Sequence, residues 1–347
     1  MRRASLSTLQ GHEVLAKAIF DEEGRILLRE GIIIKTTFIN KLQALGITYV
    51  YIEDEVSQGI EINDVVSEET RQQSKKAIAE TAQKFIRRGD ISLQGIVTAA
   101  EKVIDDILSQ KEVMIDLVDI RAKEDVLFSH SVNVSILSVM TGCNMGYNMA
   151  KLKELAVGAL LHDMGIISIM KETHPGSGKF ELDKSRYQEH PKLGYDILNK
   201  QSSISSFVKI IALTHHEKMD GTGYPFGLKA DEIHEMVRIV SVCNAFDSIM
   251  HNNRMLFDVP PYQAIEFLEA SPDIFDTNIV KHFTANVSLY PSGMRVRLNT
   301  GEPGIVCRQN KGFPSRPVVR LLSVLNKDVE VDLSQTLNIF IEEVYED

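Results

Sequence analysis

Apolar residues recur at helical spacing through the middle of the chain. Between residues 91 and 285 they fall three and four positions apart, as they do on one face of an amphipathic helix. The clearest groups are Leu127, Val134 and Leu137; Leu152, Leu155, Ala156, Ala159 and Leu160; and Phe207, Ile210 and Ile211. Segments rich in glycine or proline interrupt the pattern at 174–178, 220–225 and 260–261, and these are expected loops. The pattern predicts one all-helical domain over residues 91–285.

The two ends of the chain show a different pattern, in which short apolar runs alternate with turns. The expected N-terminal elements are a helix at 37–45 and strands at 14–20, 25–28 and 47–52. The expected C-terminal strands are 295–298, 304–307 and 318–322. The prediction is a mainly α protein with a small α+β domain at 1–62 and a β-rich module at 286–347. Neither end carries a motif that assigns it a function.

A polar helix is expected between these parts, over about residues 67–88 of a linker at 63–90. Its apolar stripe is narrow and is formed by Ala77, Ile78, Ala82, Phe85 and Ile86. Two interpretations remain open. The helix packs on its own domain as a connection, or it is a signalling helix that forms a homodimer or contacts a signalling partner.

Composition excludes several classes of function. The 347 residues contain 38 Lys and Arg against 48 Asp and Glu, a net charge of −10, which argues against a nucleic-acid polymer as partner. The three cysteines, Cys143, Cys243 and Cys307, are far apart and indicate neither a disulfide framework nor a thiolate metal site. Apolar runs of membrane-spanning length and a signal-like N-terminus are not found, so we expect no membrane span and a cytoplasmic protein.

Histidines and aspartates on apolar helix faces are the main chemical signal. His130 shares a face with Leu127, Val134 and Leu137, and Asp247 continues the stripe formed by Met236, Val240 and Cys243. The other candidates end or begin expected helices; they are His162, Asp163, His190, His215 and His216. One such histidine is more often a core residue than a ligand, but a buried carboxylate is costly unless it is paired or metal-bound. Together these residues predict a metal site.

These residues, followed by Gly221-Thr222-Gly223-Tyr224-Pro225, resemble the HD-GYP family of HD phosphohydrolases. The resemblance covers roughly residues 120–285. It implies an all-helical bundle around a metal centre that hydrolyses the bacterial messenger cyclic di-GMP to pGpG, to GMP or to both. The nucleophile would be a hydroxide activated by two metal ions.

The resemblance also implies a role for each residue. One metal would be held by His130, His162, Asp163 and Asp247, and a second by Asp163, His190, His215 and His216, with Asp163 catalytic as the bridge. Some members bind a third metal through a glutamate at the position of Val126, so two divalent ions are expected here. Iron or manganese is favoured, while zinc, nickel and cobalt fit the same ligands. Gly223, Tyr224 and Arg254 are the expected substrate contacts.

Two departures from the family pattern remove positively charged side chains that are expected to contact the phosphate of the substrate. The lysine of the His-Asp-x-Gly-Lys motif is replaced by Ile166, and Leu256 stands where a second arginine is usual. The sequence therefore leaves an alternative to catalysis, namely a catalytically weak receptor that binds cyclic di-GMP or a protein partner. A third alternative is an HD phosphohydrolase for another nucleotide. Metal identity, product and oligomeric state are not determined by the sequence.

Overall fold

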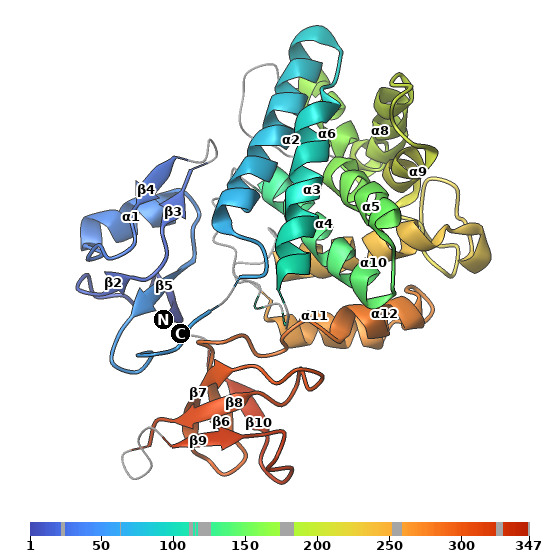
Figure 1. Ribbon diagram of the computed structural model, residues 1–347. Coiled ribbons are helices and arrows are strands. Elements are labelled where there is room, and N and C mark those ends of the chain that lie inside the picture. Colours follow the sequence, from blue (N-terminus) through green and yellow to red (C-terminus); the bar gives the residue numbers. More distant parts are fainter. Residues whose placement is uncertain are drawn as a thin grey trace. The chain divides into compact units, whose positions relative to one another are not determined.

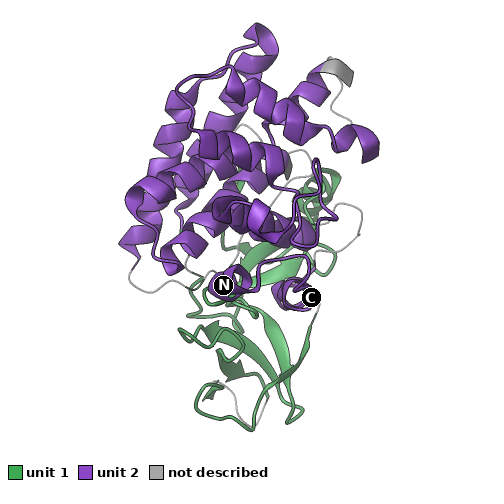
Figure 2. Ribbon diagram, turned by 90° about the vertical axis from the view of Figure 1, so that its right-hand side faces the viewer, with its two compact units in different colours: residues 1–65, 112–126, 284–347 green, residues 66–111, 127–283 purple. Residues whose placement is uncertain are grey.

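The computed structural model describes residues 1–21, 25–62, 64–110, 114, 116, 126–173, 184–251, 259–323 and 329–345. The chain forms two compact units, which Figure 2 colours separately. The first contains residues 1–65, 112–126 and 284–347, and the second contains residues 66–111 and 127–283. Each unit is described by itself below.

The second unit is helical, as the spacing of apolar residues predicts (Figure 1). Its longer helices are α2 (Glu68–Arg88), α3 (Leu93–Ser109), α4 (Val126–Asn144), α5 (Met149–Leu161), α6 (Met164–Thr173), α8 (His190–Asn199), α9 (Ser206–Thr214) and α10 (Glu235–Met250). The shorter ones are α7 (Lys184–Tyr187), η1 (Ala230–Glu232), α11 (Pro261–Glu269) and α12 (Thr277–Thr284). Pro191 lies in the first turn of α8, where a proline needs no main-chain donor, so the helix restarts there as expected.

Helix α2 belongs to this unit and packs along α3. The Thr81 hydroxyl donates to the main-chain oxygen of Ser92 (3.0 Å), and the Ser67 hydroxyl donates to Asp106 of α3 (2.9 Å). Ser67 also caps α2 by accepting from the Thr70 amide. The expected boundary at residue 90 therefore falls inside one compact unit, and the signalling interpretation of α2 stays a prediction.

Two glycines lie at close contacts between helices of this unit. A Cβ on Gly158 of α5 would lie 2.4 Å from Cδ1 of Ile211 on α9. A Cβ on Gly165 of α6 would lie 1.9 Å from the main-chain oxygen of His190 on α8. These contacts bring three helix ends that carry candidate ligands close to one another.

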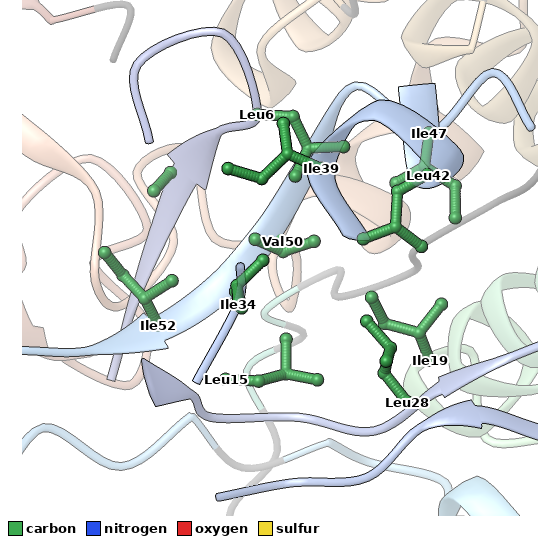
Figure 3. Close-up of a cluster of buried hydrophobic side chains, with 11 residues drawn as sticks. Leu6, Leu15, Ile19, Leu28, Ile34, Ile39, Leu42, Ile47, Val50 and Ile52 are labelled. Carbon is green, nitrogen blue, oxygen red and sulfur yellow. The ribbon is translucent and has the colours of Figure 1, made fainter. Parts of the chain in front are cut away.

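The first unit contains the N-terminal elements. Strands β1 (Arg2–Ser5), β5 (Tyr49–Glu53) and β2 (Val14–Leu15) form an antiparallel sheet in that order, and β3 (Ile19–Phe20) pairs with β4 (Ile26–Leu28). Helix α1 (Thr36–Ala44) packs on this sheet through Ile39 and Leu42. Figure 3 shows the shared core, in which Leu15, Ile34 and Val50 are fully buried. Strand β1 was not expected, because its sequence Arg-Arg-Ala-Ser lacks an apolar alternation.

The C-terminal elements of the same unit form a five-stranded antiparallel sheet in the order β10-β6-β7-β8-β9. The strands are β6 (Arg295–Leu298), β7 (Pro303–Arg308), β8 (Val318–Leu321), β9 (Glu330–Asp332) and β10 (Ile341–Val344). The three central strands match the expected ones, while the polar edge strands β9 and β10 were missed. This sheet shares a small core with Ile60, and Arg320 donates to the main-chain oxygen of Gln58 (2.7 Å). The expected 1–62 and 286–347 modules are thus parts of one compact unit.

Candidate metal centre

The centre is built where helices end. His162 is the C-cap of α5, directly after Leu161, Asp163 follows it, and α6 begins at Met164. His190 begins α8, and His215 is the C-cap of α9, directly after Thr214, with His216 after it. The backbone is helical on only one side of a residue at a helix end. Side chains from several helix ends can therefore converge on one point without interrupting any helix.

Three buried imidazoles place Nδ1 within hydrogen-bond distance of a main-chain oxygen of the preceding turn. The pairs are His162 with Ala159 (2.7 Å), His190 with Tyr187 (2.6 Å) and His215 with Ala212 (3.1 Å). A carbonyl only accepts, so Nδ1 carries the proton and Nε2 keeps its lone pair. This arrangement is the usual one for histidine ligands of metals.

The ligand atoms gather into two groups that share Asp163. In one, Asp163, His190, His215 and His216 offer atoms that lie within 4.8 Å of one another. In the other, His130, His162 and Asp163 do the same. Asp163 is 6% exposed, and its Oδ1 lies 3.2 Å from Nε2 of His190 while its Oδ2 lies 3.4 Å from Nε2 of His162. One carboxylate thus faces both groups.

The residues present fit a cation. Nε2 of His190 and Nε2 of His215 lie 3.1 Å apart, and because both keep a lone pair they would repel each other without a shared positive charge. Among the described residues, Nε2 of His162, Nε2 of His216 and Oδ1 of Asp163 are buried without a hydrogen-bond partner. Such groups are expensive to bury unless a ligand completes them. Imidazole with carboxylate suits divalent iron, manganese, zinc, nickel or cobalt.

Electrostatics favour the protonation states that bind metal at Asp163, His215 and His216. Burial lowers the pKa of His215 to about 4, and burial followed by the neighbouring His215 lowers the pKa of His216 well below its usual value. Burial opposes ionisation of Asp163, but the surrounding imidazoles, His162 first, hold the pKa of Asp163 well below its usual value. Burial likewise opposes the charge on His162, which the Asp163 carboxylate outweighs, so the pKa of His162 is raised. Asp163 is therefore an anion, with neutral imidazoles at 215 and 216.

Asp247 and His130 lie together at the edge of the centre. Oδ2 of Asp247 lies 2.6 Å from Nδ1 of His130, and Nε2 of His130 lies 2.9 Å from Oδ1 of Asn244. Asp247 is 2% exposed on α10, but among the described residues it is in neither group of mutually close ligand atoms. Its Oδ2 is instead paired with His130. His251, one turn after Asp247, places Nδ1 3.1 Å from the Asp247 main-chain oxygen.

The segment after His216 folds back over it. The rings of His216 and Tyr224 stack with centroids 4.6 Å apart and an interplanar angle of 17°. The Tyr224 amide donates to the main-chain oxygen of His216 (3.3 Å), and the Tyr224–Pro225 peptide is cis. A Cβ on Gly223 would lie 2.5 Å from Cα of Glu217, so glycine is required at this close approach. The structure thus brings Gly223 and Tyr224 to the centre.

Glu217 fixes this loop, a role that the sequence did not reveal. Its side chain is 2% exposed; Oε1 accepts from the Phe226 amide (2.7 Å) and Oε2 from the Leu228 amide (2.9 Å). A buried carboxylate that accepts two main-chain amides holds the loop as a turn. The only available signal was the carboxylate directly after the paired histidines, and its spacing alone does not indicate which amides it reaches.

Of the two departures from the family pattern, Ile166 lies within the described residues and Leu256 does not. Ile166 is 6% exposed in the first turn of α6, and its amide donates to the Asp163 main-chain oxygen (2.9 Å). An apolar side chain therefore fills the place of the expected cation. The predicted substrate contact Arg254, and Leu256 beside it, lie outside the described residues.

Comparison with known proteins agrees with this geometry. A family model described as an HD domain matches residues 112–279, and a model described as a KOW domain associated with an HD domain matches residues 295–347. Residues 112–279 are thus similar to the HD domain family, and curated relatives of the chain are named cyclic di-GMP phosphodiesterases. The mainly α fold expected from the sequence is confirmed. The second match gives the C-terminal sheet a family relationship that its sequence alone did not indicate.

The chain has curated relatives that are named phosphodiesterases of cyclic dinucleotides. A protein named cyclic di-GMP phosphodiesterase from Pseudomonas aeruginosa is 29% identical over 223 residues, which are 62% of this chain and 54% of that protein. A second of that name, from Thermotoga maritima, is 33% identical over 161 residues, 44% of this chain and 43% of the relative. A 3'3'-cGAMP-specific phosphodiesterase from Vibrio cholerae is 29% identical over 189 residues, 54% of this chain and 37% of the relative. The chain thus spans about half the length of such relatives, or less.

A helix that crosses a bilayer must be long and apolar. Within the parts of the chain that the structure describes, none is both long enough and apolar enough to span a membrane.

Proposed function

We propose that this chain is a metal-dependent phosphodiesterase that hydrolyses cyclic di-GMP to pGpG, to GMP or to both. The observation that carries the proposal is the pair of ligand groups joined through Asp163. The curated relatives support the reaction class, because several are named phosphodiesterases of cyclic dinucleotides. The proposed ligands are His130, His162, Asp163, His190, His215, His216 and, beside His130, Asp247.

The side chains have distinct tasks in this proposal. Divalent ions held by them would supply positive charge for the phosphodiester and a nucleophile at neutral pH. Asp163 joins the two groups and fixes their separation, because one oxygen faces His190 and the other faces His162. Tyr224 covers His216 and leaves its ring edge and hydroxyl for a nucleobase or phosphate. Backbone at Gly223 lets the loop approach the site closely.

The decisive experiment measures turnover of pure substrates by the full chain. Protein loaded anaerobically with Fe(II) or Mn(II) should linearise cyclic di-GMP, with products separated by chromatography. Asp163→Asn should reduce turnover by at least about 10³-fold, because it removes the charge shared by both groups. Asp105→Asn, an exposed aspartate on α3, is the matched control and should leave turnover unchanged. A parallel assay with 3'3'-cGAMP decides which cyclic dinucleotide is preferred.

The buried Ile166 favours a second candidate, a weakly catalytic receptor for cyclic di-GMP. In that case the metals and the loop hold the dinucleotide, while the missing cation leaves the transition state poorly stabilised. Metal-loaded protein that binds cyclic di-GMP in calorimetry but releases no linear product would support the receptor and contradict the enzyme.

A further inference from the structure

Helix α2 buries a cation close to the proposed metal centre. Arg71, in the first turns of α2, is 3% exposed, and its Nη1 donates to Oδ1 of Asn133 on α4 (2.7 Å). The start of α2 is fixed against α3, because both the amide and the hydroxyl of Ser67 donate to Asp106. Arg71 precedes the matched HD segment, 112–279, so the family match assigns it nothing.

Asn133 links Arg71 to Asp247 through hydrogen bonds. Its Nδ2 donates to Oδ1 of Asp247 (3.1 Å), and Oδ2 of Asp247 lies 2.6 Å from Nδ1 of His130. Arginine can only donate, so the amide oxygen of Asn133 must face Arg71 and its NH₂ group must face Asp247. The orientation of the amide is thereby fixed by chemistry as well as by coordinates.

The contacts from Arg71 to Asp247 are shielded from water. Asn133 is 1% exposed and Asp247 is 2% exposed. In such surroundings hydrogen bonds are stronger, and each polarises the next. Burying a guanidinium costs free energy unless it is well paired. The buried position of Arg71 beside Asn133 and Asp247 therefore indicates that it has a function there.

We propose that Arg71 is a positioning residue for the metal centre, acting through Asn133 to orient the Asp247 carboxylate. The inference rests on the proposed function. Asn133 holds one carboxylate oxygen of Asp247, and the other oxygen is then directed at His130. The position of Arg71, which α2 sets, therefore determines how the Asp247–His130 pair is oriented. Helix α2, expected from the sequence to connect or to signal, is then coupled to the site by two hydrogen bonds.

The test measures Mn(II) binding to metal-free full-length protein by electron paramagnetic resonance, alongside thermal unfolding. Arg71→Met should weaken Mn(II) binding about 10- to 100-fold, the range typical of residues that support metal ligands. Arg71→Lys, which keeps the charge but loses the fork of donors, should fall between Met and wild type. Arg87→Met, on the exposed last turn of the same helix, should bind Mn(II) like wild type.

Asn133→Asp separates positioning from packing. Aspartate has the shape of asparagine and would pair with Arg71, so a packing role predicts wild-type Mn(II) binding. A positioning role predicts weaker binding, because the donor to Asp247 is replaced by a second carboxylate.

The outcomes distinguish this inference from the proposed function. Wild-type protein that binds no Mn(II) or Fe(II) would overturn the proposed function and the inference with it. Wild-type protein that binds Mn(II), with Arg71→Lys and Asn133→Asp binding it equally well, would overturn the inference alone. These two variants keep their charge or shape, so they decide the matter even if Arg71→Met does not fold.

Discussion

Gly165 lies so close to His190 that a Cβ on the glycine would come within 1.9 Å of the His190 main-chain oxygen. The two residues belong to α6 and α8, and each helix begins next to a candidate ligand. The contact sets the separation of Asp163 from His190: Oδ1 of Asp163 lies 3.2 Å from Nε2 of His190. Packing between two helices thus determines the geometry of the centre.

Gly165→Ala should therefore damage both stability and metal binding. The new methyl meets main-chain atoms, which cannot rotate away, so the helices must separate at a cost of about 3 kcal/mol or more. Thermal unfolding and Mn(II) titration of the metal-free protein measure the two effects. Gly95→Ala in α3 is the matched control. Its Cβ meets Ala77 at an ordinary 3.5 Å, so this change should raise stability by about 0.5–1 kcal/mol and leave metal binding intact.

Glu217→Gln should loosen the loop without removing a ligand. Glutamine keeps one acceptor but turns an NH₂ group towards the second amide, so one of the bonds to Phe226 and Leu228 is lost. We expect KM for cyclic di-GMP to rise about 10-fold, a loss of about 1.4 kcal/mol, with Mn(II) affinity nearly unchanged. Glu232→Gln, which affects one exposed bond to the Lys229 amide, is the control. Equal KM values for all three proteins would refute the role of Glu217.

Tyr224 offers a ring contact and a hydroxyl, and two variants separate them. Tyr224→Phe keeps the stack on His216, so kcat/KM should stay within about threefold of wild type, whereas Tyr224→Ala should lose about 10-fold. Steady-state kinetics with cyclic di-GMP measure both. If the phenylalanine variant is as impaired as the alanine variant, the hydroxyl rather than the ring is the working group.

Ile166→Lys restores the cation of the family motif at a buried position. Stability of the metal-free protein should fall by about 1–3 kcal/mol, because an ammonium is poorly tolerated where Ile166 is 6% exposed. Turnover of cyclic di-GMP should rise at least about 10-fold, since a cation near the phosphate stabilises the transition state. Single-turnover kinetics measure the chemical step, and Ile166→Met is the uncharged control. An unchanged rate for the lysine variant would show that the absent cation does not limit this protein.

Removal of metal should destabilise the fold around the centre. Buried Nε2 atoms of His162 and His216 lose their only ligand, and the facing Nε2 atoms of His190 and His215 repel. Protein at a metal concentration 100-fold above Kd should gain about 2.7 kcal/mol over the chelated protein. Calorimetric scans with and without chelator, and with Mn(II) restored, measure this difference. Identical unfolding temperatures would contradict a resident metal.

The sequence by itself determined much of the fold and identified most of the candidate ligand residues. Spacing of apolar residues located the helices from Leu152 and from Phe207, because a helix with one buried face must repeat every three to four residues. The histidines and aspartates were identifiable because polar groups on such faces need a reason to be there. Edge strands such as β10 were missed, because a strand with one exposed side and few neighbours needs little apolar sequence.

Tertiary structure decided what no local pattern encodes. It joined α2 to the helical unit, closed the loop on Glu217, paired Asp247 with His130 and brought Arg71 to Asn133 across 62 positions of sequence. Local sequence sets the conformation of a helix through contacts three or four residues apart. Contacts between distant residues depend on how whole helices pack, and small residues such as Gly165 decide that packing by permitting one close approach.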